Sequence, residues 1–313
     1  MSSHAERLLK KIKRSRKGAK LNQIRYAHEY ESIRRLQSEC GHSVARLCEI
    51  AGVSRSGYYK WLKHQPSARE TENRQVLEEL RSIHHEVKGI YGYRRMAMNL
   101  RRRFDRHVNH KSVYRLMEAG GLRCVIRKKR KKYVRSTPKQ TAENILNREF
   151  QADRPNQKWL TDVTEFKYGS SGKAYLSAIL DIYDGSIRSF VIGHSNNTSL
   201  VFETLHQALQ GDPGAMPLLH SDRGFQYTSR AFGRMTKAAG ITQSMSRVGK
   251  CIDNGPMESF FGALKCESYR LRKYRTYDDL SKAVTEYMRF YNQDRFQERL
   301  NGLSPLEFRA EAV

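Results

Sequence analysis

Residues 158–168 read KWLTDVTEFKY, a short run rich in β-branched and aromatic residues that is typical of a β-strand. Two further apolar runs follow it, KAYLSAILDIYDG and IRSFVIGHS. Gly and Ser turns at 169–172 and 184–186 join the three runs, which indicates strands that follow one another directly. The sequence therefore predicts a β-meander at this point of the chain.

Beyond the meander, the pattern alternates between helix and strand. We expect a helix at about 198–210, the short strand MPLLHSD, a second helix at about 228–239 and the strand ITQSMS. Together with the meander, these runs make five strands with helices between them. The expected fold class is an α/β domain with a mixed five-stranded sheet.

Three acidic residues lie at chemically informative points of this pattern. Asp162 falls within the first strand, and Asp222 ends the fourth. Glu258 follows Asn254-Gly255-Pro256, an N-cap with an early proline, which predicts a place in the first turn of a helix. A strand centre, a strand end and a helix start can converge on one point above a sheet edge.

Taken singly, each acid has a structural explanation. Asp162 could pair with a buried arginine, Asp222 could cap a turn, and Glu258 could favour the helix dipole. Taken together, the three carboxylates predict a site for two Mg²⁺ ions, for which Mn²⁺ would substitute, because hard cations prefer oxygen ligands. Two such ions roughly 3.5–4 Å apart would activate a water or a 3′-hydroxyl and stabilise the leaving oxygen of a phosphodiester.

Lys265 lies seven residues beyond Glu258, two helical turns along, so both side chains share one helix face. We expect its ammonium to grip a phosphate beside the metal ions; a solvated lysine is the alternative. His220 and Asn254 flank the acids and are candidates for supporting contacts.

The chain has 313 residues and a formal net charge of +26, most of it in the first half. Residues 1–150 contain 37 Lys and Arg against 14 Asp and Glu, whereas residues 151–313 contain 21 against 18. Such an excess usually neutralises phosphates with release of counterions, so we expect a nucleic acid or another polyanion as the partner; a solvated basic face is the alternative. Together with the acidic trio, the charge favours double-stranded DNA.

A membrane surface is the competing polyanion. No apolar stretch approaches the roughly 18–20 residues that a spanning helix needs, and the N-terminus lacks the apolar core of a signal peptide. We therefore expect no membrane partner and a cytoplasmic, nucleoid-associated protein.

Residues 1–42 are expected to form a basic arm or helix, and residues 43–66 a helix-turn-helix. The run SVARLCEIAGVSRSGYYKWLK has apolar residues at helical spacing on both sides of a break at 51–53, and Ser54 is a suitable N-cap for the second helix. The residues that open this helix are the expected DNA contacts: Arg55, Ser56, Tyr58 and Tyr59.

A generic helical hairpin would show the same break. In that interpretation Tyr58 belongs to the core, and Trp61 and Leu62 are expected in the core in either case.

Residues 71–122 predict a second helical, helix-turn-helix-like DNA-binding domain, in which Asn109 caps the last helix and glycines 120 and 121 end it. Residues 123–150 predict a basic linker. Most basic residues of both segments are expected to contact phosphates and not bases. They are Arg94, Arg95, Arg101, Arg102, Arg103 and Lys111 in the domain, and Arg127, Lys128, Lys129, Arg130, Lys131 and Lys132 in the linker.

These segments resemble a known family, the DDE transposases of bacterial insertion sequences, and in particular the second-frame (OrfB) product of the insertion sequence 3 family. The matching stretches are WLTDVTEF, LLHSDRGFQYTS and SMSRVGKCIDNGPMESFFGALKCE. Between Asp222 and Glu258 stand 35 residues, the spacing of that family. The resemblance extends to YGYRRMAMNLRR, VNHKSVYRLMEAGG and YMRFYNQDRFQERLNGLSPLEF, and so covers nearly everything from about residue 43.

The resemblance implies an RNase H-like integrase catalytic core at 151–270, followed by a C-terminal helical extension at 271–313. It also implies Mg²⁺-dependent cleavage at the terminal inverted repeats of the element, strand transfer by the freed 3′-hydroxyl into target DNA, and a joined-end circular intermediate. Because two DNA ends must be processed together, we expect a homo-oligomer, at least a dimer, in the synaptic complex.

An upstream-frame (OrfA) product is a further candidate partner, since family members are often frameshift fusions whose first frame adds a helix-turn-helix and a leucine zipper. Residues 1–42 show no sustained heptads, so a zipper is not expected within them.

Two other functions compete with that of a transposase. One is a non-catalytic DNA-binding regulator, against which the intact acidic trio with Lys265 speaks. The other is a simple RNase H-type nuclease that acts on RNA–DNA hybrids, which would not need the large basic half.

Overall fold

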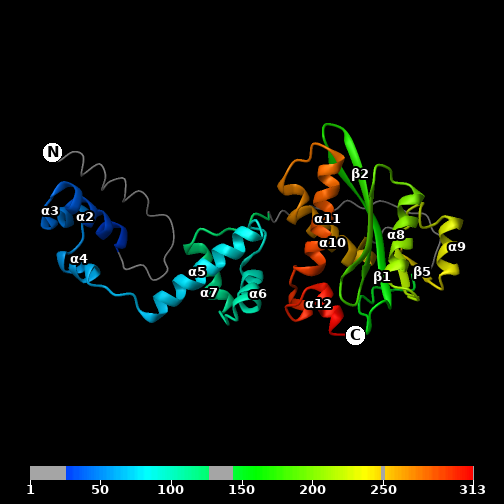
Figure 1. Ribbon diagram of the computed structural model, residues 1–313, viewed down its shortest axis with the longest axis horizontal. Helices are drawn as coiled ribbons and strands as arrows, with labels where there is room; N and C mark the ends of the chain where they lie inside the picture. The colour runs from blue at the N-terminus through cyan, green and yellow to red at the C-terminus, as the bar shows by residue number, and fades with distance from the viewer. Residues whose placement is uncertain (1–25, 127–143, 248–250, 313) are drawn as a thin grey trace. The chain divides into compact units, whose positions relative to one another are not determined.

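The computed structural model describes residues 26–126, 144–247 and 251–312 (Figure 1). The chain forms two compact units, residues 1–125 and residues 126–313. The basic arm up to residue 25 and the linker residues Arg127 to Lys132 lie outside the described residues. None of the described helices is long and apolar enough to cross a membrane.

The first unit begins with three short helices, α2 (Ala27–Cys40), α3 (Val44–Ala51) and α4 (Arg55–Leu62). The Ser54 hydroxyl accepts a hydrogen bond from the Gly57 N–H, as predicted for the N-cap of α4. The helices share one apolar core, whose buried side chains include Tyr30, Ile33, Leu47 and Tyr58. Val44–Ala51 and Arg55–Leu62 therefore form the two helices that the sequence predicts around the break.

Trp61 is partly buried against this core, but Leu62 is 46% exposed. The core assignment of Leu62 is therefore wrong. Leu62 is the last residue of α4, where the helix leaves the core.

Three further helices follow, α5 (Ala68–Glu86), α6 (Tyr93–Phe104) and α7 (His110–Ala119). A capping box of Ser67 and Glu70 starts α5 three residues before the expected Thr71. The Asn109 side chain accepts from the Lys111 N–H and caps α7, as predicted. The buried side chains of the three helices include Val76, Leu80, Ile83, Met96, Leu100, Val113 and Leu116.

The second unit contains the predicted mixed five-stranded sheet. Its strands are β1 (Lys158–Tyr168), β2 (Gly172–Asp181), β3 (Ile187–Gly193), β4 (Leu218–Ser221) and β5 (Thr242–Met245), in the order β3-β2-β1-β4-β5. The first three strands form the antiparallel meander, while β4 is parallel to β1 and β5 is parallel to β4. The long strand β1 is therefore central and belongs to both the antiparallel and the parallel half.

Helices cover both faces of this sheet (Figure 1). On one face lie α8 (Thr198–Gly211) and α9 (Arg230–Ala238), packed on a core that includes Trp159 and Ile179. On the other lie α10 (Gly255–Glu267) and α11 (Tyr277–Gln293), packed on a core that includes Leu160 and Phe166.

The unit continues to the C-terminus through α12 (Pro305–Ala310), with 3₁₀ turns at Cys251–Asn254, Tyr269–Leu271 and Glu298–Leu300. The α11 side chains Leu280, Val284 and Met288 are buried in the same core as Leu160. The C-terminal helices are thus part of the compact sheet unit.

Candidate active site

Strand β1 presents Asp162 to the face of the sheet that α10 covers. Successive side chains of a strand point to opposite faces, and both Leu160 and Phe166 pack with Phe260 and Leu264 of α10. Asp162 and Thr164 share the alternation of Leu160 and Phe166. The acid predicted at the strand centre therefore lies under the helix that carries Glu258.

Asp222 directly follows β4, the parallel neighbour of β1. Leu160 pairs with His220 at the end of that ladder, and Asp162 and Asp222 each follow this pair by two residues. Asp222 therefore lies just beyond the end of β4, close enough for its charge to act on Asp162. The Asp222 Oδ1 accepts the Gly224 N–H at 2.8 Å, and a Cβ at Gly224 would lie only 3.0 Å from that oxygen. A glycine at 224 is therefore what lets the turn fold back onto the carboxylate.

Glu258 lies in the first turn of α10, as predicted, with Asn254 at the N-cap and Pro256 in the opening turn. It is exposed, so its side chain can change rotamer without disturbing the core. Asp222 and Glu258, from two other segments, both lie near enough for their charges to act on Asp162.

The electrostatics of the site reflect this proximity. Burial raises the pKa of Asp162 to about 7, and the negative charges of Asp222 and Glu258 add to the effect against the Val163 N–H and Lys265. Desolvation by the surrounding protein also raises the pKa of Asp222 and of Glu258, although both residues are solvent-accessible. Without a cation, the charges of Asp222 and Glu258 disfavour ionisation of the buried Asp162.

This donor set suits a divalent cation, because carboxylate oxygens are the ligands of Mg²⁺ and Mn²⁺, and a cation would relieve the repulsion. In the described residues, however, no group of three His, Cys, Asp or Glu side chains lies close enough together to hold a metal ion as it stands. Joint coordination requires a side-chain movement, for which the exposed Glu258 is suited.

Lys265 is half-buried beside the same strand. Its ammonium donates a hydrogen bond to the Thr164 hydroxyl and lies 5.4 Å from the centroid of the Phe166 ring. Desolvation lowers the pKa of Lys265, and Arg270 contributes in the same direction, while Asp162 and Glu165 oppose it. Lys265 is therefore aligned along β1 next to the acids.

His220 and Asn254 both make contacts around the site. The buried His220 ring lies between the Ser244 hydroxyl, 2.9 Å from Nδ1, and the Ser246 hydroxyl, 3.0 Å from Nε2. Burial lowers the pKa of His220 to about 4, so the ring is neutral and joins β4 to β5. The Asn254 Nδ2 donates to the Thr161 carbonyl at 3.2 Å, and its buried Oδ1 has no hydrogen-bond partner among the described residues.

Two buried residues beside the acids were not predicted from the sequence. The Tyr227 hydroxyl lies 3.2 Å from the Thr161 hydroxyl, and Asp253 is fully buried one residue before the N-cap of α10. An acid in the polar run CIDNG gives only a weak local signal, since its partners lie far away in the chain.

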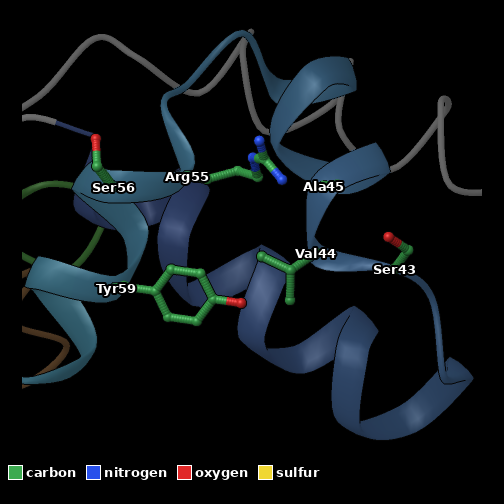
Figure 2. Close-up of a pocket in the computed structure, with 6 residues that line it drawn as sticks. All are labelled: Ser43, Val44, Ala45, Arg55, Ser56 and Tyr59. Carbon is green, nitrogen blue, oxygen red and sulfur yellow. The ribbon is translucent and has the colours of Figure 1, made fainter.

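The first helical cluster, formed by α2, α3 and α4, has a shallow groove between the starts of α3 and α4. Figure 2 shows Arg55 and Tyr59 projecting from α4 toward the beginning of α3, with Ser56 on the same helix start. Arg55, Ser56 and Tyr59 are accessible, as a DNA contact requires.

The prediction that Tyr58 contacts DNA is wrong. It is 0% exposed, and its hydroxyl donates to the Gln37 Oε1 at 3.1 Å within the core, so it does not offer a surface to DNA. The adjacent Tyr59, one residue on and turned by about 100° around the helix, takes the exposed position.

The predicted basic residues of α6 and α7 are mostly exposed. Arg95 is half-buried, with its guanidinium 5.6 Å from the Tyr91 ring centroid, and Arg103 forms an ion pair with Glu86. The exposed members are Arg94, Arg101, Arg102, Arg103 and Lys111.

Comparison with known proteins identifies the family of this chain. Models of an integrase core domain match residues 152–251 and 258–312, and a model of an HTH-like domain matches residues 71–130. The protein named transposase InsK, of insertion sequence element IS150 from Escherichia coli (strain K12), is 40% identical over 264 residues, which cover 84% of this chain and 92% of that protein. The chain belongs to the insertion sequence 3 family of transposases.

This transposase is also similar to proteins of other insertion elements. The 31 kDa protein of insertion element IS600 from Shigella sonnei is 35% identical over 270 residues, 84% of this chain and 97% of that protein. Among solved structures, the HTLV-2 integrase catalytic core domain in complex with magnesium covers 50% of the transposase and 98% of that chain, with 19% identity and a TM-score of 0.38. The transposase is an integrase-type polynucleotidyl transferase with an RNase H-like catalytic core.

Proposed function

We propose that the transposase binds the terminal inverted repeats of its element, cleaves the DNA ends and transfers the freed 3′-ends to target DNA, with Asp162, Asp222 and Glu258 as its metal ligands. The observation that carries this proposal is the buried carboxylate of Asp162, whose pKa is raised to about 7 by burial and by the nearby negative charges of Asp222 and Glu258. A site that disfavours its own charges in the absence of a cation is suited to bind one.

The three acids and Lys265 would each have a separate role. The carboxylates of Asp162, on β1, and of Asp222, directly after β4, would hold Mg²⁺ or Mn²⁺, and Glu258 would complete the ligand set from α10. When bound, a pair of divalent cations supplies activation of the attacking oxygen and stabilisation of the leaving oxygen. Lys265 would exchange its hydrogen bond to Thr164 for one to a phosphate oxygen.

DNA would be bound by the helical half and the basic linker. The exposed Arg55, Ser56 and Tyr59 open one helix-turn-helix, and the exposed arginines of α6 together with Lys111 lie in the domain that matches the HTH-like model. Two ends must be joined in one event, so the active form would be at least a dimer assembled on DNA at the bacterial nucleoid. An upstream-frame product is a candidate partner in that complex.

The test is a joining assay with purified protein, Mg²⁺ and a supercoiled plasmid that carries the DNA flanking the gene. The variant Glu258→Gln keeps the side-chain shape and removes the charge. The matched control is Glu286→Gln, an exposed glutamate on α11.

We expect joined ends and strand-transfer products from the wild type and from Glu286→Gln, and none from Glu258→Gln, with unchanged binding to the end DNA in all three. Near-normal joining by Glu258→Gln would contradict the metal-site assignment. Binding without chemistry in every sample would favour a regulator.

A further inference from the structure

Asp253 is a fully buried carboxylate at the start of the helix that carries Glu258. Its Oδ1 accepts hydrogen bonds from the Arg148 Nε at 2.7 Å and from a terminal guanidinium nitrogen of Arg247 at 3.2 Å. Its Oδ2 accepts from the Asn144 Nδ2 at 3.0 Å, the Arg247 N–H at 3.0 Å and the Arg247 Nε at 3.1 Å. Both oxygens are thus used by donors from two other parts of the chain.

These donors compensate the buried charge. Burial alone would raise the pKa of Asp253, but the hydrogen bonds and charges of Arg247 and Arg148 outweigh it and hold the pKa well below its usual range. Asp253 is therefore ionised at neutral pH. A buried carboxylate with two guanidinium partners and a backbone N–H has a well-determined position, because any displacement leaves charged groups unpaired.

The contacts of Asp253 connect three segments. Asn144 and Arg148 precede β1, Arg247 follows β5, and Asp253 itself lies in the turn that leads into α10. The first of these segments is in turn bound to β5, since the Ile145 and Leu146 N–H groups donate to the Ser244 hydroxyl. The start of α10 is therefore attached to the sheet on the side of β5.

The next residue attaches the same turn to β1. The Asn254 Nδ2 donates to the carbonyl of Thr161, the residue before Asp162. Glu258 follows Asn254 by four residues, which is about one helical turn. Asp253 and Asn254 together fix where the first turn of α10 begins relative to Asp162.

We propose that Asp253 is a positioning residue for the metal site: the buried clamp of Asp253 with Arg148 and Arg247 holds the first turn of α10 where Glu258 can share a divalent cation with Asp162. This role rests on the proposed function. Asp253 itself does not contact the metal or DNA; it acts through the backbone that carries Glu258.

The physical reason lies in the exposed side chain of Glu258. Its rotamer is adjustable, so the position of its backbone sets whether any rotamer brings the carboxylate to the cation. Mg²⁺ demands near-ideal octahedral geometry, and supporting groups one step removed from the ligands typically change metal affinity by about 10–100-fold.

The test compares Asp253→Asn with a matched control, Asp184→Asn. Asp184 is also fully buried and paired with an arginine, Arg309, whose guanidinium lies 2.8 Å from it. It lies in the β2–β3 turn, away from the three acids. In both variants an amide NH₂ replaces a carboxylate oxygen and faces guanidinium donors.

The wild type and both variants are compared in three measurements. Calorimetry with bound end DNA gives the affinity for Mg²⁺ and Mn²⁺. Circular dichroism gives the melting temperature in EDTA, and the plasmid assay gives joining. We expect Asp253→Asn to weaken Mg²⁺ binding by about tenfold or more and to lower joining with it. Asp184→Asn should lower the melting temperature similarly and keep its metal affinity.

Metal affinity of Asp253→Asn within twofold of the wild type would overturn the role, as would an equal loss in Asp184→Asn. If Asp253→Asn does not fold, the variant Arg148→Gln tests the role of Asp253 in its place. It removes one hydrogen-bond donor to Asp253 at a partly exposed position, and it should weaken Mg²⁺ binding about threefold or more. A wild type that binds no divalent cation would overturn the proposed metal site itself, whereas normal wild-type binding with unaffected variants would overturn only the role of Asp253.

Discussion

Lys265 donates a hydrogen bond to the hydroxyl of Thr164, which lies two residues beyond Asp162 on the same face of β1. This hydrogen bond places the Lys265 side chain of α10 beside β1, next to Asp162. Because the acceptor is a neutral hydroxyl and not a carboxylate, the ammonium keeps its charge available for a phosphate oxygen at little cost.

Replacing Lys265 by Ala should lower joining at least tenfold, because a phosphate beside the metal site would lose its charged donor. Lys265→Arg should keep part of the activity, since it keeps the charge but not the compact ammonium that fits Thr164. The plasmid joining assay measures both. Lys282→Ala, at an exposed lysine of α11, should leave joining unchanged, and a loss there as large as at Lys265 would contradict a local role.

Asp162→Asn should abolish joining and yet stabilise the metal-free protein above neutral pH. The pKa of Asp162 is raised from 3.8 to about 7 in the folded state, so the folded protein binds a proton that the unfolded chain has released, and this residue makes stability fall as pH rises from about 4 to about 7. The amide removes that loss, and each kcal/mol regained raises the melting temperature of a domain of this size by about 2–4 °C.

Melting in EDTA at pH 8 measures the difference between Asp162→Asn and the wild type. Added Mg²⁺ should raise the melting temperature of the wild type but not that of the variant. A lower melting temperature for Asp162→Asn in EDTA would mean that the carboxylate is structurally stabilised and not strained by its neighbours.

Tyr58→Ala and Tyr59→Ala should separate core from surface in the first helical cluster. Loss of a buried aromatic side chain typically costs about 3–5 kcal/mol, whereas a surface change usually stays within about 0.5 kcal/mol. Tyr58 is fully buried and Tyr59 is 52% exposed. Urea denaturation followed by circular dichroism measures the cost, and gel-shift binding to the end DNA should be weakened by Tyr59→Ala in a protein of normal stability.

Neutralising Arg127 through Lys132 with glutamine should weaken DNA binding about equally for end DNA and unrelated DNA. Phosphate contacts carry no sequence information, and each one lost should lower the slope of log affinity against log salt by about 1. Fluorescence anisotropy at a series of NaCl concentrations measures the slope. An unchanged slope would remove these residues from the DNA path.

Much of the fold could be predicted because its signals are local. The run from Lys158 to Tyr168 marks β1, Ser54 and Asn109 act as the predicted N-caps, and Pro256 marks the beginning of α10. Asp162, Asp222 and Glu258 were identified as one candidate site because each lies at a recognisable strand or helix position. Their joint role as metal ligands stays a prediction.

Other features could not be read from local sequence. Tyr58 and Tyr59 are adjacent and chemically identical, and packing against α2 and α3 decides that the face of α4 with Tyr58 is buried and the face with Tyr59 is not. Leu62 is apolar yet exposed, because α4 ends there. His220 lies two residues before a candidate ligand, but its partners are Ser244 of β5 and Ser246 just after it, so it packs the sheet.

The sequence by itself determined the family, the order of helices and strands, and the three acids, because capping, alternation and motif spacing all act over a few residues. Tertiary structure alone decided which contacts surround those acids: Asp253 with Arg148 is a contact between residues 105 positions apart, and Asn254 with Thr161 joins residues 93 positions apart. Such pairs leave no periodic signal, since they form only when the sheet has brought β1, β5 and α10 together.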